Sequence, residues 1–202
     1  MFDNRIKIGI TQGDTNGIGW EVILGALADP MILEICTPVV YGSRKAAEYY
    51  STKMGEEFVL PHFHYCASAA DARYGAVNFV EVGDKQLAVE PGKSTEASAK
   101  AAIAALEASV ADLQSEELNA VVTAPICKEG MSAAGFGYTG HTEYFADKAE
   151  GSATMMMCSD ILRVALATIH IPVQSVSQSL TTEALVNQLV ALRATLKSDF
   201  GV

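Results

Sequence analysis

The sequence alternates short apolar runs with segments of helical character, and this alternation limits the folds that the chain can adopt. Residues 5–11, 36–41 and 120–123 are rich in β-branched side chains, as strands commonly are. Each run is followed by turn residues and then by a stretch with helical signals. Strands that alternate with helices in this way predict an α/β fold whose sheet is largely parallel.

A long helix after residue 94 is the most regular element that the sequence predicts. Ser94 can cap its start, and apolar residues then recur at helical spacing on one face: Ala99, Ala102, Ile103, Leu106, Val110 and Leu113. Further helices are expected at 17–28, 44–54 and 181–200, the last ended by Gly201, and further strands at 58–65 and 78–82. Together these elements continue the alternation along the chain.

The second half of the chain carries another strand signal. Residues 161–172 have the pattern of a buried strand, with His170 near its end, and Met155–Met157 suit the filling of a core. A boundary is expected near Leu118, where the long helix ends. The expected domains are therefore a first α/β lobe over 1–118 and the start of a second α/β lobe over 119–202, which carries the chemistry-bearing residues.

Charge and composition exclude several classes of protein. The chain has 24 Asp and Glu against 14 Lys and Arg, so its net charge is -10, and such a surface repels nucleic acid and anionic membranes. No apolar run reaches the roughly 18 residues of a membrane span, and the first ten residues lack a secretory pattern. The four cysteines are far apart, without a Cys-x-x-Cys motif. We expect a cytoplasmic protein that binds neither nucleic acid nor membranes.

A glycine-rich loop follows the first strand. Gly13, Gly17 and Gly19 lie between that strand and a helix start, where backbone N–H groups can cradle an anion. Their spacing matches neither the dinucleotide fingerprint nor the P-loop, so an anion cradle and a tight turn both remain open. His62 and His64 share one face of their strand. No third metal donor is near them in the sequence, which favours a half-exposed strand face over a metal site.

The most informative stretch follows the strand at 120–123. After a glycine-rich loop a helix restarts near residue 140, which places His141 and Thr142 at its N-terminus. Free N–H groups there favour an anion, so an imidazole and a hydroxyl beside them suit a phosphate or a hydroxy-carboxylate. His170 closes the later strand pattern, and ligands of open α/β sheets gather outside strand ends. Ordinary roles also remain open: His141 as a cap or surface residue, and His170 as a hydrogen-bond partner of a loop.

Three stretches with distinctive motifs stand in a fixed order: GITQGDTNGIG at 9–19, TAPICK at 123–128 followed by YTGHTEYF at 138–145, and LRVALATIHIP at 162–172. In this order they resemble the 4-hydroxythreonine-4-phosphate dehydrogenase family of vitamin B6 biosynthesis. The resemblance extends over nearly the whole chain. This chain departs from the family at Gln12, Thr15, Asn16 and Trp20, where members often carry prolines, while the glycines are kept.

The resemblance implies an isocitrate/isopropylmalate-dehydrogenase-like fold of α/β/α layers, incomplete in this chain. It implies a homodimer whose active site is shared between the subunits. The family oxidises 4-phosphooxy-L-threonine, a small phosphorylated substrate, with NAD, and loss of CO2 then gives 3-amino-2-oxopropyl phosphate. A divalent metal (Zn, Mg or Co) held by three histidines takes part. Such a cation lowers the pKa of the alcohol that is oxidised.

Matched by motif, His141 and Thr142 correspond to the family's substrate-binding pair and His170 to its first metal-ligand histidine. Lys128 suits proton transfer or anion binding, and a solvated lysine fits its position equally well. Family chains continue past the last residue of this one, and the other two metal histidines lie in that part. Because no histidine follows His170, we expect this chain to be a fragment that is inactive alone.

Two alternative functions remain open from the sequence. Proteins similar to this family act on phosphorylated four-carbon sugar acids, such as phospho-threonate or phospho-erythronate, and no residue in the sequence distinguishes those substrates. A non-catalytic phosphate-binding module on the same fold would also keep the anion-binding residues.

Overall fold

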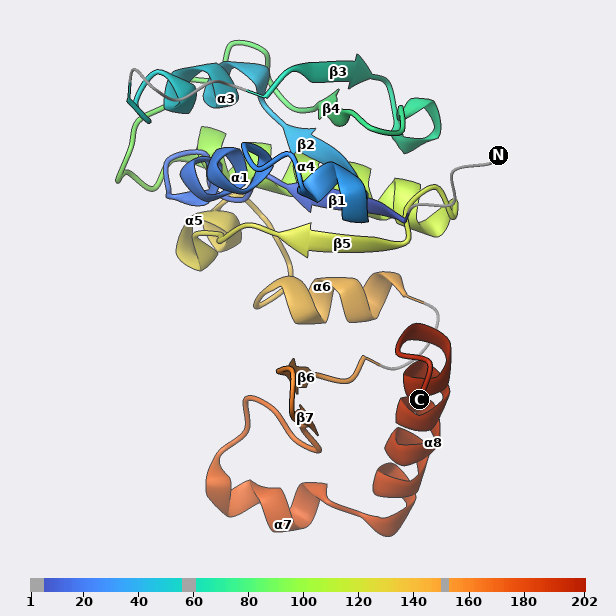
Figure 1. The fold of residues 1–202 in the computed structure, drawn as a ribbon. Coiled ribbons are helices and arrows are strands. Elements are labelled where there is room, and N and C mark those ends of the chain that lie inside the picture. Colours follow the sequence, from blue (N-terminus) through green and yellow to red (C-terminus); the bar gives the residue numbers. More distant parts are fainter. Residues whose placement is uncertain (1–5, 56–60, 150–152) are drawn as a thin grey trace. The chain divides into compact units, whose positions relative to one another are not determined.

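The computed structural model describes residues 6–55, 61–149 and 153–202, and its contacts divide the chain into two units, one ending at His141 and one beginning at Thr142. The strands are β1 (Lys7–Thr11), β2 (Thr37–Gly42), β3 (Phe63–Cys66), β4 (Val77–Glu81), β5 (Ala120–Thr123), β6 (Met156–Cys158) and β7 (Arg163–Ala165) (Figure 1). The helices are α1 (Gly19–Leu27), α2 (Ile32–Ile35), α3 (Arg44–Ser51), η1 (Ala69–Asp71), α4 (Glu96–Gln114), α5 (Lys128–Ala133), α6 (His141–Lys148), η2 (Val173–Ser175), α7 (Val176–Ser179) and α8 (Thr182–Asp199).

A five-stranded sheet forms the centre of the first unit. Its strand order is β3-β4-β2-β1-β5, and every neighbouring pair is parallel. The central strand β2 is buried along its whole length, as a parallel strand covered on both faces should be. The prediction of an α/β fold with a largely parallel sheet is confirmed.

Helices cover both faces of this sheet. Successive residues of β2 point to opposite faces, so Val40 packs in one core with Trp20 of α1 and Tyr50 of α3. Val39 and Tyr41 pack in a second core. Ala105 of α4 belongs to that second core, and its small side chain lets the helix lie close to the sheet. The result is the predicted α/β/α layering.

The cap of α4 is one residue later than predicted. Thr95 has the extended backbone of an N-cap, and its side chain accepts a hydrogen bond from the N–H of Ser98 at 3.1 Å. The predicted cap, Ser94, instead accepts a contact from the Cys127 thiol at 3.4 Å. Both residues suit a cap chemically, so the choice depends on which one has the required backbone conformation.

The expected boundary near Leu118 falls inside the first unit. β5 pairs with β1 from Ile8 opposite Ala120 to Thr11 opposite Thr123, so the strand after Leu118 completes the first sheet. The first unit then continues to His141. The contacts therefore divide the chain later than the end of the long helix suggested.

The second unit differs from its sequence prediction. The buried strand expected over 161–172 is wrong: β7 covers only Arg163–Ala165 and pairs with β6 in an antiparallel ribbon. Ile161 is 95% exposed and Met157 is 62% exposed, so neither side chain fills a core within this chain, while Met155 and Met156 are partly buried. An apolar pattern records only that a side chain can be buried, and Ile161 and Met157 stay exposed among the described residues. No helix in the described ranges has the length and apolar character needed to cross a membrane.

Candidate functional site

The strand order has a point, at β1, where the connections pass from one side of a strand to the other. From β1 the chain builds β2, β3 and β4 on one side, and it then returns to place β5 on the other side of β1. In open parallel sheets, ligands bind outside the carboxyl ends of the strands at such a point. Here those ends are Thr11 and Thr123, which face each other in the sheet register. A candidate site is therefore expected beside these two residues.

The glycine-rich loop after β1 packs against the loop after β5. Gly13 has a φ of +66°, and a Cβ at this position would lie 2.3 Å from the carbonyl oxygen of Pro125. The N–H of Asp14 donates to that same oxygen at 2.9 Å, and the N–H of Gly17 donates to the Asp14 carbonyl at 3.0 Å. Because these amides already have partners inside the protein, the geometry favours the tight turn over the anion cradle.

Asn16 extends this packing to a third loop. Its side-chain amide donates to the Lys93 carbonyl at 2.9 Å and to the Thr95 hydroxyl at 3.1 Å. Its side-chain oxygen accepts from the N–H of Glu90 at 2.7 Å. The sequence did not single out this residue for a structural role, because its partners lie more than 70 positions along the chain. The loop thus braces the edge of the sheet at which the site lies.

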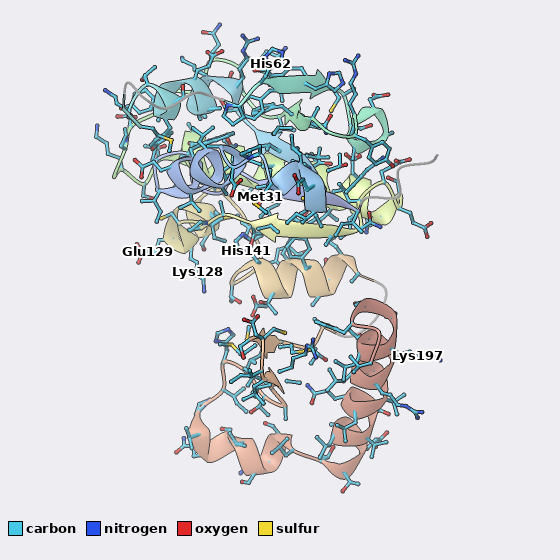
Figure 2. All side chains as sticks on the ribbon, viewed as in Figure 1. Met31, His62, Lys128, Glu129, His141 and Lys197 are labelled. Atoms are coloured by element: carbon cyan, nitrogen blue, oxygen red, sulfur yellow. The ribbon has the colours of Figure 1, made fainter. Side chains whose placement is uncertain are left out.

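His141 stands at the start of α6, as the sequence predicted, and is partly buried (Figure 2). Its Nδ1 atom lies 3.5 Å from the hydroxyl of Thr123, the last residue of β5. Its Nε2 atom is buried and has no hydrogen-bond partner among the described residues. A buried polar atom without a partner costs about 1–3 kcal/mol. A ligand that bonded this nitrogen would remove that cost.

The surroundings of His141 keep its ring neutral. Burial is the main cause that lowers the pKa of this imidazole, and the positive charge of Lys128 lowers it further. A neutral imidazole offers one N–H donor and one acceptor nitrogen. The ring is therefore suited to form a hydrogen bond to a ligand, and Lys128 supplies the positive charge beside it (Figure 2).

The first unit has an open hollow of about 800 Å³ beside Lys128. It is lined by Lys128, Glu129, Ser132, Ala133, Phe136, Gly137, Tyr138 and Thr139. The aromatic rings of Phe136 and Tyr138 are 5.2 Å apart at their centroids. The lining offers a lysine and the Ser132 and Thr139 hydroxyls together with the Glu129 carboxylate, so it suits a polar ligand. The segment from α5 to the start of α6 thus supplies both the lining of the hollow and the imidazole.

The other two predicted site residues belong to the second unit. Thr142 is the second residue of α6 and is partly buried. His170 is exposed, with a φ of +56°, and lies in the loop between β7 and η2. The prediction that it ends a strand is wrong, because β7 stops at Ala165. Among the described residues, no three His, Cys, Asp or Glu side chains lie close enough to hold a metal.

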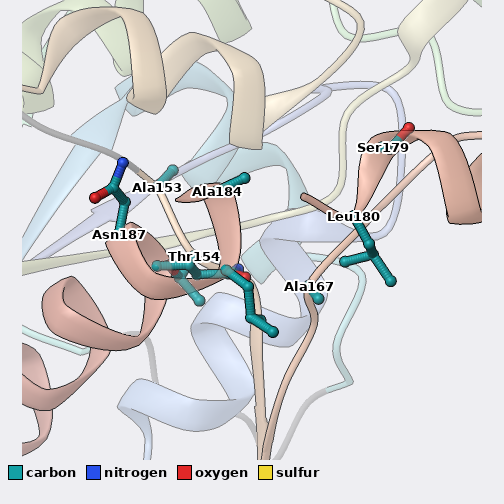
Figure 3. A pocket seen from close by; sticks show the side chains of 9 residues that line it. Ala153, Thr154, Ala167, Ser179, Leu180, Ala184 and Asn187 are labelled. Atoms are coloured by element: carbon teal, nitrogen blue, oxygen red, sulfur yellow. The ribbon is translucent and has the colours of Figure 1, made fainter. Parts of the chain in front are cut away.

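The second unit has a smaller hollow of about 240 Å³ (Figure 3). Its lining contains no ionisable side chain: Ala153, Thr154, Ala167, Ser179, Leu180, Ala184, Leu185, Asn187 and Gln188. The amide of Gln188 already donates to the Leu166 carbonyl at 2.8 Å. This hollow therefore lacks the groups for acid–base chemistry, and the region around His141 remains the candidate site.

Relatives of this chain carry a common name. This chain is 38% identical over 204 residues to a 4-hydroxythreonine-4-phosphate dehydrogenase of Bacteroides thetaiotaomicron, a match that covers 100% of this chain and 55% of that protein. It is 35% identical to the enzyme of the same name from Desulforapulum autotrophicum, covering 100% of this chain and 60% of that protein. The chain therefore spans between half and two thirds of the length of these relatives.

The fold has close counterparts among solved structures. A 4-hydroxythreonine-4-phosphate dehydrogenase from Burkholderia phymatum superposes with a TM-score of 0.83 at 28% identity, covering 96% of this chain and 59% of that one. The enzyme of that name from Klebsiella pneumoniae has a TM-score of 0.84 at 22% identity, covering 98% and 60%, and supports the fold alone. The family model described as "Pyridoxal phosphate biosynthetic protein PdxA" matches residues 34–202. Because that match includes most of the sequence, the chain belongs to the PdxA family.

Proposed function

We propose that this chain forms the substrate-binding part of a dehydrogenase that oxidises 4-phosphooxy-L-threonine with NAD in pyridoxal phosphate biosynthesis. The names of the relatives support this activity. The observation that carries it in the structure is His141, whose buried Nε2 atom has no partner in the described part of the chain. This atom belongs to a residue in contact with the end of β5, where α/β sheets bind their ligands.

The proposed reaction has two steps. The carbon that bears the substrate hydroxyl loses a hydride to NAD, the hydroxyl loses its proton, and a ketone forms. The bond from the neighbouring carbon to the carboxylate then breaks, and its electron pair stays on the substrate as an enolate while CO2 leaves. Protonation of the enolate gives 3-amino-2-oxopropyl phosphate. The substrate is thus anionic throughout, through its phosphate and, at first, through its carboxylate.

The residues of this chain would hold that anion. The overall charge of -10 repels it, so local groups must provide the attraction. His141 would donate a hydrogen bond from its neutral ring, and Lys128 would add a positive charge at the same place. Thr142, the next residue of α6, would add its hydroxyl as the second member of the substrate-binding pair.

The metal and the shared homodimer site are also part of this proposal. His170 is exposed in the second unit and would contribute one imidazole, a good ligand for divalent transition metals. The described residues bring no second and third donor to it, so this chain by itself does not fit a complete metal site. A bound cation would lower the pKa of the substrate alcohol.

A chimeric enzyme tests the proposal. The chain would be joined to the C-terminal part of the Bacteroides thetaiotaomicron relative that lies beyond the match, and NADH formation would be measured with 4-phosphooxy-L-threonine and a divalent metal. We expect activity from the chimera and none from the 202-residue chain alone. His141→Ala should lower kcat/KM by about 10- to 100-fold, since it removes a hydrogen bond to a charged group.

His62→Ala is the matched control, because His62 is exposed beside β3 and should leave kcat/KM unchanged. An active chimera that tolerates His141→Ala would contradict the role of His141. A higher kcat/KM for phospho-threonate or phospho-erythronate than for 4-phosphooxy-L-threonine would assign that sugar acid as the substrate instead. If the chimera binds the phosphorylated substrate and never forms NADH, the chain is a phosphate-binding module.

A further inference from the structure

We propose that Thr123 is a positioning residue that holds the ring of His141 with its proton on Nε2. The inference rests on the proposed role of His141 in binding an anionic substrate. Thr123 would not touch the substrate. It would act through the imidazole, by deciding whether the nitrogen that is left without a partner donates or accepts a hydrogen bond.

The two residues come from different elements and meet at the end of the sheet. Thr123 is the last residue of β5, and its backbone is held by pairing with Thr11 of β1. His141 is the first residue of α6. The Thr123 hydroxyl and the His141 Nδ1 atom are 3.5 Å apart, which is longer than most hydrogen bonds. We expect this contact to shorten when a ligand binds at Nε2.

The hydrogen-bonding capacity of a neutral imidazole couples the two nitrogens. One nitrogen carries the proton and the other accepts. If the Thr123 hydroxyl donates to Nδ1, the proton must be on Nε2, which then donates to a ligand. In the reverse arrangement Nδ1 donates to Thr123, and the lone pair of Nε2 would repel an anion. A phosphate or carboxylate accepts hydrogen bonds, so only the first arrangement fits such a substrate beside Lys128.

A neighbouring threonine provides a contrast. Thr11 faces Thr123 in the sheet register, and it is buried, with a hydroxyl that has no partner among the described residues. The two residues share their type and their position at a strand end. They differ in that the Thr123 hydroxyl contacts the imidazole, whereas the Thr11 hydroxyl has no hydrogen-bond partner among the described residues. Thr11→Val is therefore the matched control for Thr123→Val.

Nitrogen NMR of the ¹⁵N-histidine-labelled chain tests the inference, because protonated and unprotonated ring nitrogens resonate far apart. The His141 signals are assigned by their absence from His141→Gln. We expect the wild-type chain to carry the proton on Nε2. Thr123→Val should shift the ring toward the other tautomer, and Thr123→Ser, which keeps a hydroxyl, should restore the wild-type signals. Thr11→Val should leave them unchanged.

A proton on Nδ1 in the wild-type chain would overturn the inference, and so would a Thr123→Val spectrum identical to that of wild type. The wild-type spectrum decides the first point even if Thr123→Val does not fold. In the chimera, Thr123→Val should weaken the binding of 4-phosphooxy-L-threonine by about three- to tenfold. If the tautomer is as expected and the substrate does not bind, the proposed function fails while the positioning by Thr123 stands.

Discussion

At the scale of single residues, the candidate site depends on a histidine that is easier to protonate in the unfolded chain than in the folded one. Burial, and then the charge of Lys128, lower the pKa of His141 below the ordinary histidine value of about 6.5. Above about pH 6.5 both states are neutral at this residue, so it contributes no pH dependence there. Below that pH the unfolded state gains the proton first, and stability falls until the folded-state pKa is reached.

When the pH falls from about 7.5 to about 5, we expect the free energy of unfolding of His141→Gln to decrease less than that of the wild type, because glutamine does not titrate. Urea unfolding at the two pH values measures this difference. Lys128→Met, which removes only the second cause of the lowered pKa, should give a smaller effect in the same direction. Equal pH dependence in wild type and His141→Gln would show that burial of this ring has no energetic consequence.

Alanine substitutions at Gly13 and Gly92 would distinguish the cost of backbone strain from the cost of a steric clash. Both have a positive φ, +66° and +79°, but a Cβ on Gly13 would lie 2.3 Å from the Pro125 oxygen, whereas nothing lies within 4 Å of one on Gly92. Gly92→Ala should lower the free energy of unfolding by about 1 kcal/mol through strain alone. Gly13→Ala should lower it by at least about 3 kcal/mol. Equal losses in denaturant unfolding would mean that the two loops can move apart.

At the scale of elements, the start of α4 distinguishes two adjacent hydroxyls. Thr95 both caps the helix and accepts a hydrogen bond from Asn16, while Ser94 is exposed and caps nothing. Thr95→Ala should lower the free energy of unfolding by about 1–2 kcal/mol. Ser94→Ala should change it by less than about 0.5 kcal/mol. Denaturant unfolding of both variants measures the contrast, and a larger loss for Ser94→Ala would place the cap where the sequence predicted it.

At the scale of the whole molecule, the two long helices differ in what they bury. α4 buries one face, including Ala102, Leu106 and Val110, whereas α8, of nearly equal length, has no buried residue. Amides in an uncovered helix exchange through local opening, and amides in a covered one require more extensive unfolding. We expect hydrogen exchange to be faster in α8 than in α4. Equal protection would mean that another surface, such as that of a second subunit, covers α8 in solution.

Much of the fold could be predicted from the sequence because the signals for its elements are local. The strand expected at 5–11 is Lys7–Thr11, the long helix is Glu96–Gln114, and the helix with the candidate histidine begins at His141. Each prediction needs only the periodicity of nearby side chains and the residues that start or stop an element. The order of the motifs likewise indicated the family, which the comparisons confirmed.

Pairings between distant residues were decided only by the tertiary structure. Nothing near Ala120 in the sequence says that its strand pairs with β1, and nothing near Thr123 says that its hydroxyl meets His141. The sequence left the packed turn at Gly13 undecided, and it predicted a buried strand at Ile161, which is exposed. A local pattern records what a residue can do, whereas burial and contact depend on which remote segment lies against it.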